Sequence, residues 1–145
     1  MGNFTNNALI NKTAIITGGA GLLGPQHAIA LSNAGAKVIL FDINKEGLKK
    51  AKEKIIKSNN NAIVETYEID ITSLKAVEEF EKNYFQENNY CNILINNAAI
   101  NPKMKNIKDR PSGRVEDYDL SEWEQEINVG LTGAFICSRV FGSKM

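Results

Sequence analysis

The chain has 145 residues, zero formal net charge, 43% hydrophobic residues and 23% charged residues, which is the size and composition of one globular domain. The balanced charge argues against a basic nucleic-acid-binding surface, because neutralising phosphates requires clustered Lys and Arg. No apolar run approaches the roughly 20 residues of a membrane-spanning helix, and the polar segment 1–11 does not resemble a signal peptide.

Short β-rich runs alternate with longer helical runs from the start of the chain. Lys12–Thr17 is a compact apolar strand, and the glycine-rich turn Gly18–Gly24 follows it. A helix is predicted over Pro25–Ala34, because proline suits the first turn of a helix and Gly35 suits its end. Lys37–Asp42 then reads as a second buried strand.

The same alternation continues through the middle of the chain. It predicts a helix capped by Asn44 and running to about Lys57, a strand over Ala62–Ile69, a helix starting at Thr72 or Ser73, and a strand over Asn92–Ile95. In the second of these helices, Leu74, Val77 and Phe80 are expected to point inward.

The last third of the chain combines a polar loop with a final helix. The loop runs from about Ile100 to Leu120, and Ser121 with Glu124 forms a capping-box pattern at the start of the helix. The helix carries apolar residues at helical spacing, namely Trp123, Ile127, Leu131, Ala134 and Phe135. We expect Trp123 to be a core anchor.

Strands that alternate with helices predict an α/β fold in which a parallel sheet is covered on both faces, giving three layers. Right-handed crossovers favour the strand order 3-2-1-4. Ligands of such sheets bind beyond the carboxyl ends of the strands, where the order reverses. Here that point lies between the first and fourth strands.

The turn after the first strand carries a dinucleotide-binding pattern. Gly19, Gly21 and Gly24 meet the spacing G-x-G-x-x-G between a strand and a helix. Such glycines let the backbone turn tightly and approach a pyrophosphate that sits at the positive end of the helix. The candidate cofactor contacts are Gly18, Ala20, Gly21, Leu22, Leu23 and Gly24. An ordinary glycine-rich turn is the alternative interpretation.

Asp42 strengthens the dinucleotide interpretation. It ends the second strand about 20 residues further on, where an acidic residue binds the adenosine ribose hydroxyls, and Ile43 follows it as a second candidate contact. A carboxylate there repels a 2′-phosphate, and Lys45 is the nearest cation. These features favour NAD over NADP. The alternative is a solvated residue at a strand end.

Two further motifs stand at strand ends: Asp70-Ile71-Thr72 and Asn96-Asn97-Ala98-Ala99. With them, the whole chain resembles the short-chain dehydrogenases/reductases, which implies a Rossmann-type fold. The resemblance implies that Asp70 bonds the adenine amino group and that Ile71 lines the adenine pocket. It also implies that the segment Asn97, Ala98 and Ala99 passes beside the adenine ribose. Ala99 replaces the glycine of the family motif.

The resemblance has two departures. Leu22 stands where single-domain members usually have glycine, so Leu22 must either pack under the loop or narrow the space beside the pyrophosphate. The spacing Gly18, Gly21, Gly24 is instead that of the sugar-nucleotide epimerases and dehydratases. Gly130 occupies the position of the family's catalytic Asn, which interrupts the helix and orders a water. Asn128 lies two residues away on the helix and is not assigned this role.

The remaining catalytic residues of the family, a Ser and a Tyr-x-x-x-Lys, have no counterpart in this sequence. The tyrosines Tyr67, Tyr84, Tyr90 and Tyr118 are followed four residues later by Ile71, Asn88, Leu94 and Glu122. We therefore expect the N-terminal part of a longer single-domain protein, incomplete after its fourth strand, that binds cofactor without turnover. Its fourth strand and last helix should then expose apolar surface.

The parent protein is expected to be an oxidoreductase that transfers hydride between NAD(H) and an alcohol or carbonyl carbon of a small molecule. Its motifs resemble a bacterial subgroup associated with surface-sugar and flagellin modification, which suggests a sugar-derived substrate. The resemblance also implies a homo-oligomer, dimer or tetramer, and no nucleic-acid or membrane partner. A non-catalytic dinucleotide-binding module and a sugar-nucleotide epimerase or dehydratase remain alternatives.

Other candidate residues carry weaker signals. Cys91 and Cys137 lack metal-ligand spacing and are expected to be reduced core residues of a cytoplasmic protein. His27 has no metal or nucleophile partner, so no metal site is expected, and a solvent-facing or cofactor-neighbouring place is predicted for it. The loop 102–119 is either a mobile surface loop or a substrate lid whose cations would suit an anionic substrate, namely Lys103, Lys105, Lys108 and Arg110.

Overall fold

The computed structural model describes residues 8–85, 89–100 and 115–145. Within them, parallel strands form one sheet in the order β3-β2-β1-β4, as predicted. The strands are β1 (Thr13–Thr17), β2 (Lys37–Asp42), β3 (Val64–Glu68) and β4 (Ile93–Ile95). β1 and β2 lie at the centre of the sheet and are almost entirely buried, which explains why their sequences are continuously apolar.

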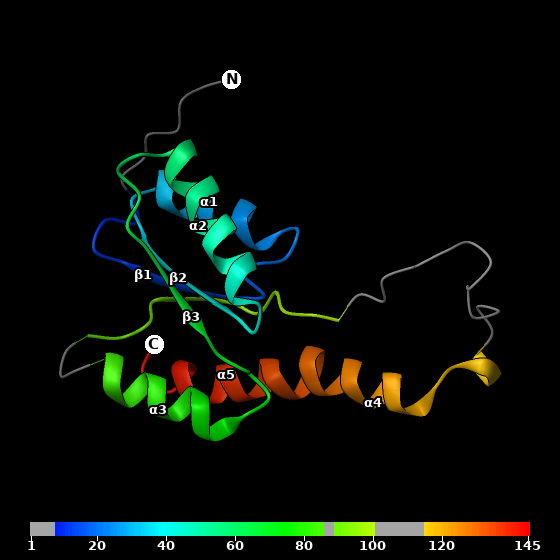
Figure 1. The fold of residues 1–145 in the computed structure, drawn as a ribbon. Coiled ribbons are helices and arrows are strands. Elements are labelled where there is room, and N and C mark those ends of the chain that lie inside the picture. Colours follow the sequence, from blue (N-terminus) through cyan, green and yellow to red (C-terminus); the bar gives the residue numbers. More distant parts are fainter. Residues whose placement is uncertain (1–7, 86–88, 101–114) are drawn as a thin grey trace.

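Helices cover both faces of the sheet, so the three-layer α/β prediction is confirmed (Figure 1). One face carries α1 (Gly24–Asn33) and α2 (Lys45–Ser58), and the other carries α3 (Leu74–Tyr84) and α5 (Ala134–Gly142). A 3₁₀ turn, η2 (Val115–Asp117), precedes α4 (Leu120–Ile127), and a π-helical stretch, η3 (Asn128–Gly133), joins α4 to α5. Figure 1 shows α4 extending past the sheet.

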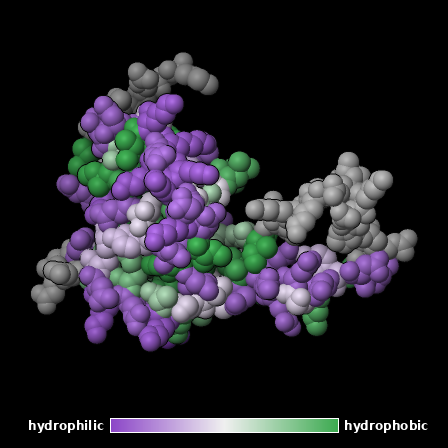
Figure 2. All heavy atoms as spheres, in the orientation of Figure 1, coloured by the Kyte–Doolittle hydropathy of each residue, from purple (hydrophilic) through white to green (hydrophobic). Residues whose placement is uncertain are grey.

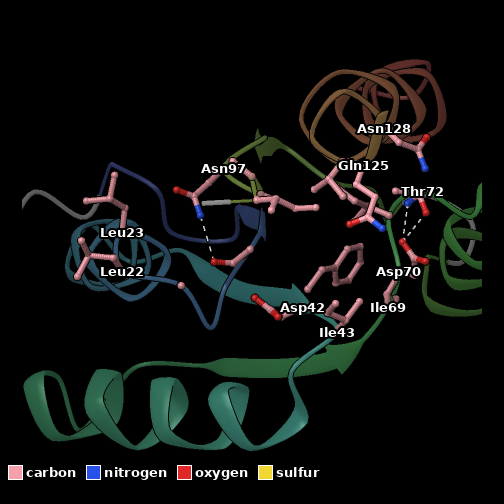
Figure 3. A pocket seen from close by; sticks show the side chains of 18 residues that line it. Leu22, Leu23, Asp42, Ile43, Ile69, Asp70, Thr72, Asn97, Gln125 and Asn128 are labelled. Atoms are coloured by element: carbon pink, nitrogen blue, oxygen red, sulfur yellow. Dashed lines mark hydrogen bonds between the residues drawn. The ribbon is translucent and has the colours of Figure 1, made fainter. Parts of the chain in front are cut away.

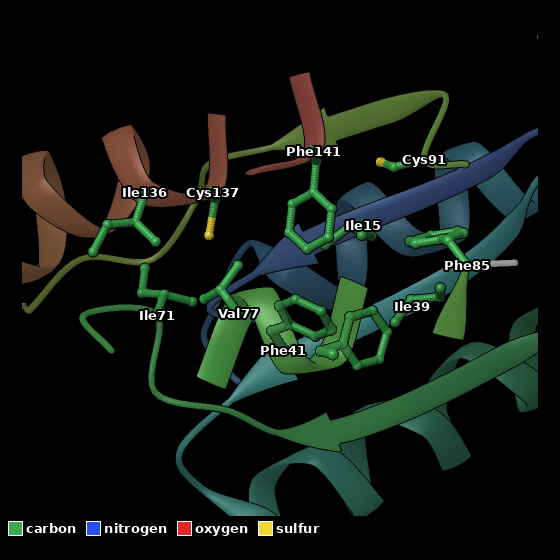
Figure 4. Close-up of a cluster of buried hydrophobic side chains, with 11 residues drawn as sticks. Ile15, Ile39, Phe41, Ile71, Val77, Phe85, Cys91, Ile136, Cys137 and Phe141 are labelled. Atoms are coloured by element: carbon green, nitrogen blue, oxygen red, sulfur yellow. The ribbon is translucent and has the colours of Figure 1, made fainter. Parts of the chain in front are cut away.

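Each face of the sheet has its own apolar core. Ile16, Val38 and Leu40 pack against α1 and α2, while Phe41 and Ile15 pack against α3 and α5. In the second core, Phe41 makes edge and tilted ring contacts with aromatic side chains from the helices (Figure 4). Cys91 and Cys137 lie buried in this cluster as free thiols, as predicted.

The strand ends are aligned by the parallel register. Thr17 pairs with Phe41, and Asp42 pairs with Glu68. The loops that follow the four strands therefore leave the same edge of the sheet. Asp42, Asp70 and Asn97, which are distant in the sequence, come from these loops.

Two predictions for the final helix are wrong. Asp119, not Ser121, caps α4: the Asp119 carboxylate accepts hydrogen bonds from the backbone N–H and the hydroxyl of Ser121, so that hydroxyl acts as a donor. Trp123 is not a core anchor, because 53% of its surface is exposed. The reason is that α4 extends beyond the sheet and has no layer of the described chain to cover that face.

Candidate functional site

A pocket of about 710 Å³ opens at the carboxyl ends of the strands, within the usual size range for small-molecule sites. Its walls come from the loops after β1, β2, β3 and β4 and from α4 and η3 (Figure 3). The lining residues are Gly18, Gly21, Leu22, Leu23, Phe41, Asp42, Ile43, Ile69, Asp70, Ile71, Thr72, Asn97, Ala98, Ala99, Ile100, Gln125, Asn128 and Val129. No Lys or Arg occurs among these described lining residues.

The glycine-rich loop is folded so tightly that side chains would not fit at two positions. Gly18 has a φ of +64°, and a Cβ there would lie 2.8 Å from the Ala98 Cα. A Cβ at Gly24 would lie 2.5 Å from the Gly18 carbonyl oxygen. These two glycines let the loop and the first turn of α1 pack directly against each other and against the end of β4.

Backbone donors at the start of α1 are available to a ligand. Among the described residues, no acceptor bonds the N–H groups of Leu22, Leu23 and Gly24, and no side chain caps the helix. Free N–H groups at a helix N-terminus, together with the helix dipole, attract an anion. The residues present therefore fit a diphosphate at this end of the pocket.

Asp42 is fixed in place by two backbone amides. Its Oδ2 accepts a hydrogen bond from the Ala20 N–H at 3.0 Å, and its Oδ1 accepts one from the Asn44 N–H at 2.9 Å. A carboxylate oxygen has room for a second donor, so both oxygens can still accept from hydroxyl groups. The carboxylate thus lies ready for a diol, beside the loop that offers donors to phosphate.

Asp70 is fixed on one side only. Its Oδ1 accepts hydrogen bonds from the Thr72 N–H at 2.9 Å and from the Thr72 hydroxyl at 2.7 Å. Its Oδ2 has no partner among the described residues. This oxygen is therefore free to accept a hydrogen bond from a ligand amino group.

Thr17 and Asn97 join the first and fourth strands beneath the pocket. The buried Thr17 hydroxyl accepts hydrogen bonds from the backbone N–H groups of Asn97 and Ala98, both at 3.0 Å. The Asn97 side chain donates to the Thr17 and Gly18 carbonyl oxygens at 3.0 and 3.1 Å (Figure 3). These bonds hold the end of β4 against the glycine-rich loop and give the pocket a rigid floor.

Leu22 does not pack under the loop. Its surface is 89% exposed, and it lines the pocket. Of the two places expected for this side chain, the structure therefore favours the one beside the ligand space. Leu23, which is 56% exposed, lies next to it (Figure 3).

The structure brings together all the predicted cofactor contacts except two. Ala20 does not line the pocket, but its N–H orients Asp42, and Gly24 packs against Gly18 and the backbone of Gly19. His27 is half-exposed and does not line the pocket, and neither does Lys45. The lysines and the arginine of the proposed lid, between 101 and 114, lie outside the described residues.

Several lining residues were not predicted from the sequence. Gln125, Asn128 and Val129 enter the pocket from the final helix, and Ile69 and Thr72 flank Asp70. The spacing of the first three, i, i+3 and i+4, marks one helix face and is the signal that could have found them. This spacing was overlooked because the apolar residues of the same helix gave a more prominent pattern.

Gly130 does not line the pocket, and a Cβ there would meet nothing within 4 Å. The expected helix interruption is present, because Gly130 lies inside the π-helical stretch η3. Asn128, to which the catalytic role was not assigned, lines the pocket.

The described residues offer neither a metal site nor a reactive thiol. No group of three or more His, Cys, Asp and Glu side chains among them could hold a metal ion. Burial raises the pKa of Cys91, and burial followed by the nearby Cys91 raises the pKa of Cys137 to about 12. Both thiols are therefore protonated near neutral pH and are poor nucleophiles.

The sequence model of the short chain dehydrogenase family matches residues 12–145. The chain belongs to the short-chain dehydrogenase family. Relatives include the uncharacterised oxidoreductase YxbG of Bacillus subtilis (strain 168), 33% identical over 131 residues, which are 90% of this chain and 44% of the relative. An uncharacterised oxidoreductase of Thermotoga maritima is 29% identical over 137 residues, which are 94% of this chain and 49% of the relative.

Two solved structures superpose on almost the whole chain. A protein from Haemophilus influenza named as a D-mannonate oxidoreductase, with bound NAD, has a TM-score of 0.79 and 27% identity, over 97% of this chain and 52% of that one. Levodione reductase also has a TM-score of 0.79, with 26% identity over 94% of this chain and 50% of that chain. This short-chain dehydrogenase sequence thus spans about half the length of these two structures and of the two curated relatives. No helix of its described part is long and apolar enough to cross a membrane.

Proposed function

We propose that this chain is the NAD-binding part of an oxidoreductase that moves hydride between NAD(H) and an alcohol or carbonyl carbon. The observation that carries the proposal is the pairing of two features in one pocket. Unpaired N–H groups of Leu22, Leu23 and Gly24 stand at the start of α1, and the oriented carboxylate of Asp42 stands beside them. Together they match a diphosphate and the adjacent ribose diol.

The charge of the site favours NAD over NADP. Asp42 stands where the adenosine ribose would lie, and a 2′-phosphate there would meet its negative charge. The described lining has no Lys or Arg that could offset this repulsion, and Lys45 lies outside the lining. Similar solved structures occur with either cofactor, NAD in the Haemophilus influenza protein and NADP in a metagenomic short-chain oxidoreductase, so the preference rests on the charge of Asp42.

The chain's own residues bind and orient the cofactor rather than move protons. When bound, NAD supplies the hydride acceptor, and the protein supplies position and electrostatics. A proton must also leave the alcohol as it becomes a carbonyl, and the family uses a Tyr-x-x-x-Lys for that step, which this sequence lacks. We therefore expect this chain alone to bind NAD and to show no dehydrogenase turnover.

A sugar-derived substrate is the class we favour for the parent protein. The motifs resemble enzymes of surface-sugar and flagellin modification, and the Haemophilus influenza relative is named for the sugar acid D-mannonate.

Calorimetric titration of NAD and NADP tests the proposal directly. The wild-type chain should bind NAD more tightly than NADP. The variant Asp42→Ala should lose about 10-fold or more in NAD affinity, because hydrogen bonds to a charged group contribute roughly 1.5–3 kcal/mol. Its preference for NAD over NADP should shrink, because the repulsion of the 2′-phosphate is gone.

Glu53→Ala is the matched control, because it removes the same charge from an exposed position on α2 outside the pocket. This variant should bind both cofactors as the wild type does. Equal affinities of the wild-type chain for NAD and NADP would refute the role of Asp42. Failure to bind either cofactor would refute the proposed function.

A further inference from the structure

Two amide side chains, Gln125 and Asn128, line the pocket but have no role in the dinucleotide site as described above. They lie three residues apart, at the end of α4 and the start of η3, so they share one helix face. Neither amide has a hydrogen-bond partner among the described residues. Figure 3 shows both projecting from the helix toward the loop that carries Asp70 and Thr72.

The opposite wall of this end of the pocket is the loop after β3. There the Oδ2 of Asp70 is free, because both bonds from Thr72 go to Oδ1. Free hydrogen-bonding groups thus face the same space from two elements: a carboxylate oxygen from one and two amides from the other. The remaining walls at this end are apolar, formed by Ile43, Ile69, Ile71 and Val129.

Apolar walls combined with hydrogen-bonding groups suit a flat heteroaromatic base. Its faces need apolar contact, and its edges need donors and acceptors. The 6-amino group of adenine has two N–H bonds, and the neighbouring ring nitrogen N7 accepts a hydrogen bond. Asp70 can accept from only one of those N–H bonds, whereas a Gln or Asn amide pairs well with the other one and with N7 together.

We propose that Gln125 and Asn128 bind the base edge of the dinucleotide from the side facing Asp70 and thereby set a preference for a 6-aminopurine. This inference rests on the proposed function. It extends the recognition of the base from the loop after β3 to the final helix. Gln125 and Asn128 would then determine specificity for the base of the cofactor. They would take no part in the hydride transfer.

The test compares two ligands that differ only in the amino group. ADP and purine riboside 5′-diphosphate share ribose and diphosphate, but the second has hydrogen in place of the 6-amino group. Both are titrated calorimetrically into the wild-type chain and into Gln125→Met, Asn128→Leu and the double variant. Gln26→Met and Asn83→Leu are the matched controls, because they make the same changes at exposed positions outside the pocket.

The wild-type chain should prefer ADP over the analogue. Each single variant should reduce this preference by about 3- to 10-fold, the weight of one net hydrogen bond, and the double variant should reduce it further. Affinity for the analogue should change less than affinity for ADP, which separates base recognition from a loss of folding. The two control variants should keep the wild-type ratio.

Two outcomes would overturn the inference, and they are distinguishable. If the wild-type chain binds ADP but the double variant keeps the wild-type ratio of affinities, the amides do not recognise the base and the proposed function still stands. If the wild-type chain binds neither ADP nor NAD, the proposed function fails and the inference fails with it.

Discussion

At the scale of single residues, polar groups are held by partners from other elements rather than by their sequence neighbours alone. Thr17 receives bonds from the segment after β4, and Asp42 receives one from Ala20, 22 residues earlier. The same holds for Glu65 in the sheet. Its Oε1 lies 2.7 Å from the Lys37 Nζ, and its Oε2 accepts hydrogen bonds from the hydroxyls of Tyr67 and Tyr84 at 2.9 and 2.8 Å.

This network predicts how stability depends on pH. Burial by itself would raise the pKa of Glu65, but the bonds from Lys37 and the two tyrosines outweigh burial and lower it below 4.5. A lowered carboxyl pKa stabilises the fold above the unfolded value, and this contribution is lost as the pH falls through the folded pKa. Burial and the bond to Glu65 raise the pKa of Tyr67 to about 12, so its contribution is fully present below pH 10 and is lost as the pH rises through about 12.

We therefore expect Glu65→Gln to lower the free energy of unfolding by only about 1 kcal/mol at pH 7, because the pair is partly exposed to solvent. The difference from the wild type should shrink as the pH falls below 4.5. Urea denaturation at pH 7, 5 and 3 measures it, with the exposed Glu78→Gln on α3 as control. A difference that grows toward low pH would contradict the assignment.

At the scale of elements, the final helix, which consists of α4, η3 and α5, departs from regular α-helical geometry. Its π-helical stretch contains Gly130 and Gly133, which differ in how much space surrounds them. A Cβ at Gly130 would meet nothing within 4 Å, whereas a Cβ at Gly133 would lie 2.7 Å from the Ile71 Cδ1 and 2.8 Å from its Cγ1. Glycine is therefore required by packing at one position and not at the other.

Alanine substitutions at these two positions should act in opposite directions. Gly130→Ala should raise the free energy of unfolding by up to about 1 kcal/mol, because alanine favours the helix more than glycine does. Gly133→Ala should lower it by about 1–3 kcal/mol, because Ile71 must move. Thermal unfolding followed by circular dichroism compares the two variants, and equal shifts in Tm would contradict this account.

At the scale of the whole molecule, one side of the final helix remains uncovered in the described structure. Large apolar side chains recur along it with high exposure: Leu120 at 69%, Trp123 at 53%, Ile127 at 37%, Leu131 at 64% and Phe135 at 63%. Figure 2 shows further hydrophobic surface across the middle of one face, beside the hydrophilic helix α2. Such extended apolar surface marks an interaction site or a tendency to associate.

We expect the 145-residue chain to self-associate at micromolar concentrations. Burial of the exposed apolar side chains along the final helix drives the association. β4, an edge strand of the described sheet, offers a second contact. Sedimentation velocity should show concentration-dependent species, which the variant Leu131→Glu/Phe135→Glu should reduce. A wild-type chain that sediments as a single monomer over the same range would contradict the prediction.

The sequence was sufficient for the features that depend on local pattern. The apolar runs at β1 and β2 predicted two buried strands, and the alternation of strands with helices predicted the strand order. The motifs after the four strands predicted most of the pocket lining. It was insufficient where tertiary surroundings decide. Trp123 has an apolar pattern around it, but no layer of the described chain covers it. The choice of Asp119 over Ser121 as the cap depends on backbone conformation. The spacing of Gln125 and Asn128 marks one helix face, but the fold was needed to show that this face lines the pocket.

The most direct test of the central claim is a crystal structure of the chain grown with NAD. The account predicts a diphosphate on the N–H groups of Leu22, Leu23 and Gly24. It also predicts ribose hydroxyls hydrogen-bonded to the Asp42 carboxylate and the base between Asp70 and the final helix. NAD bound at another surface, or a ribose that makes no contact with Asp42, would contradict it.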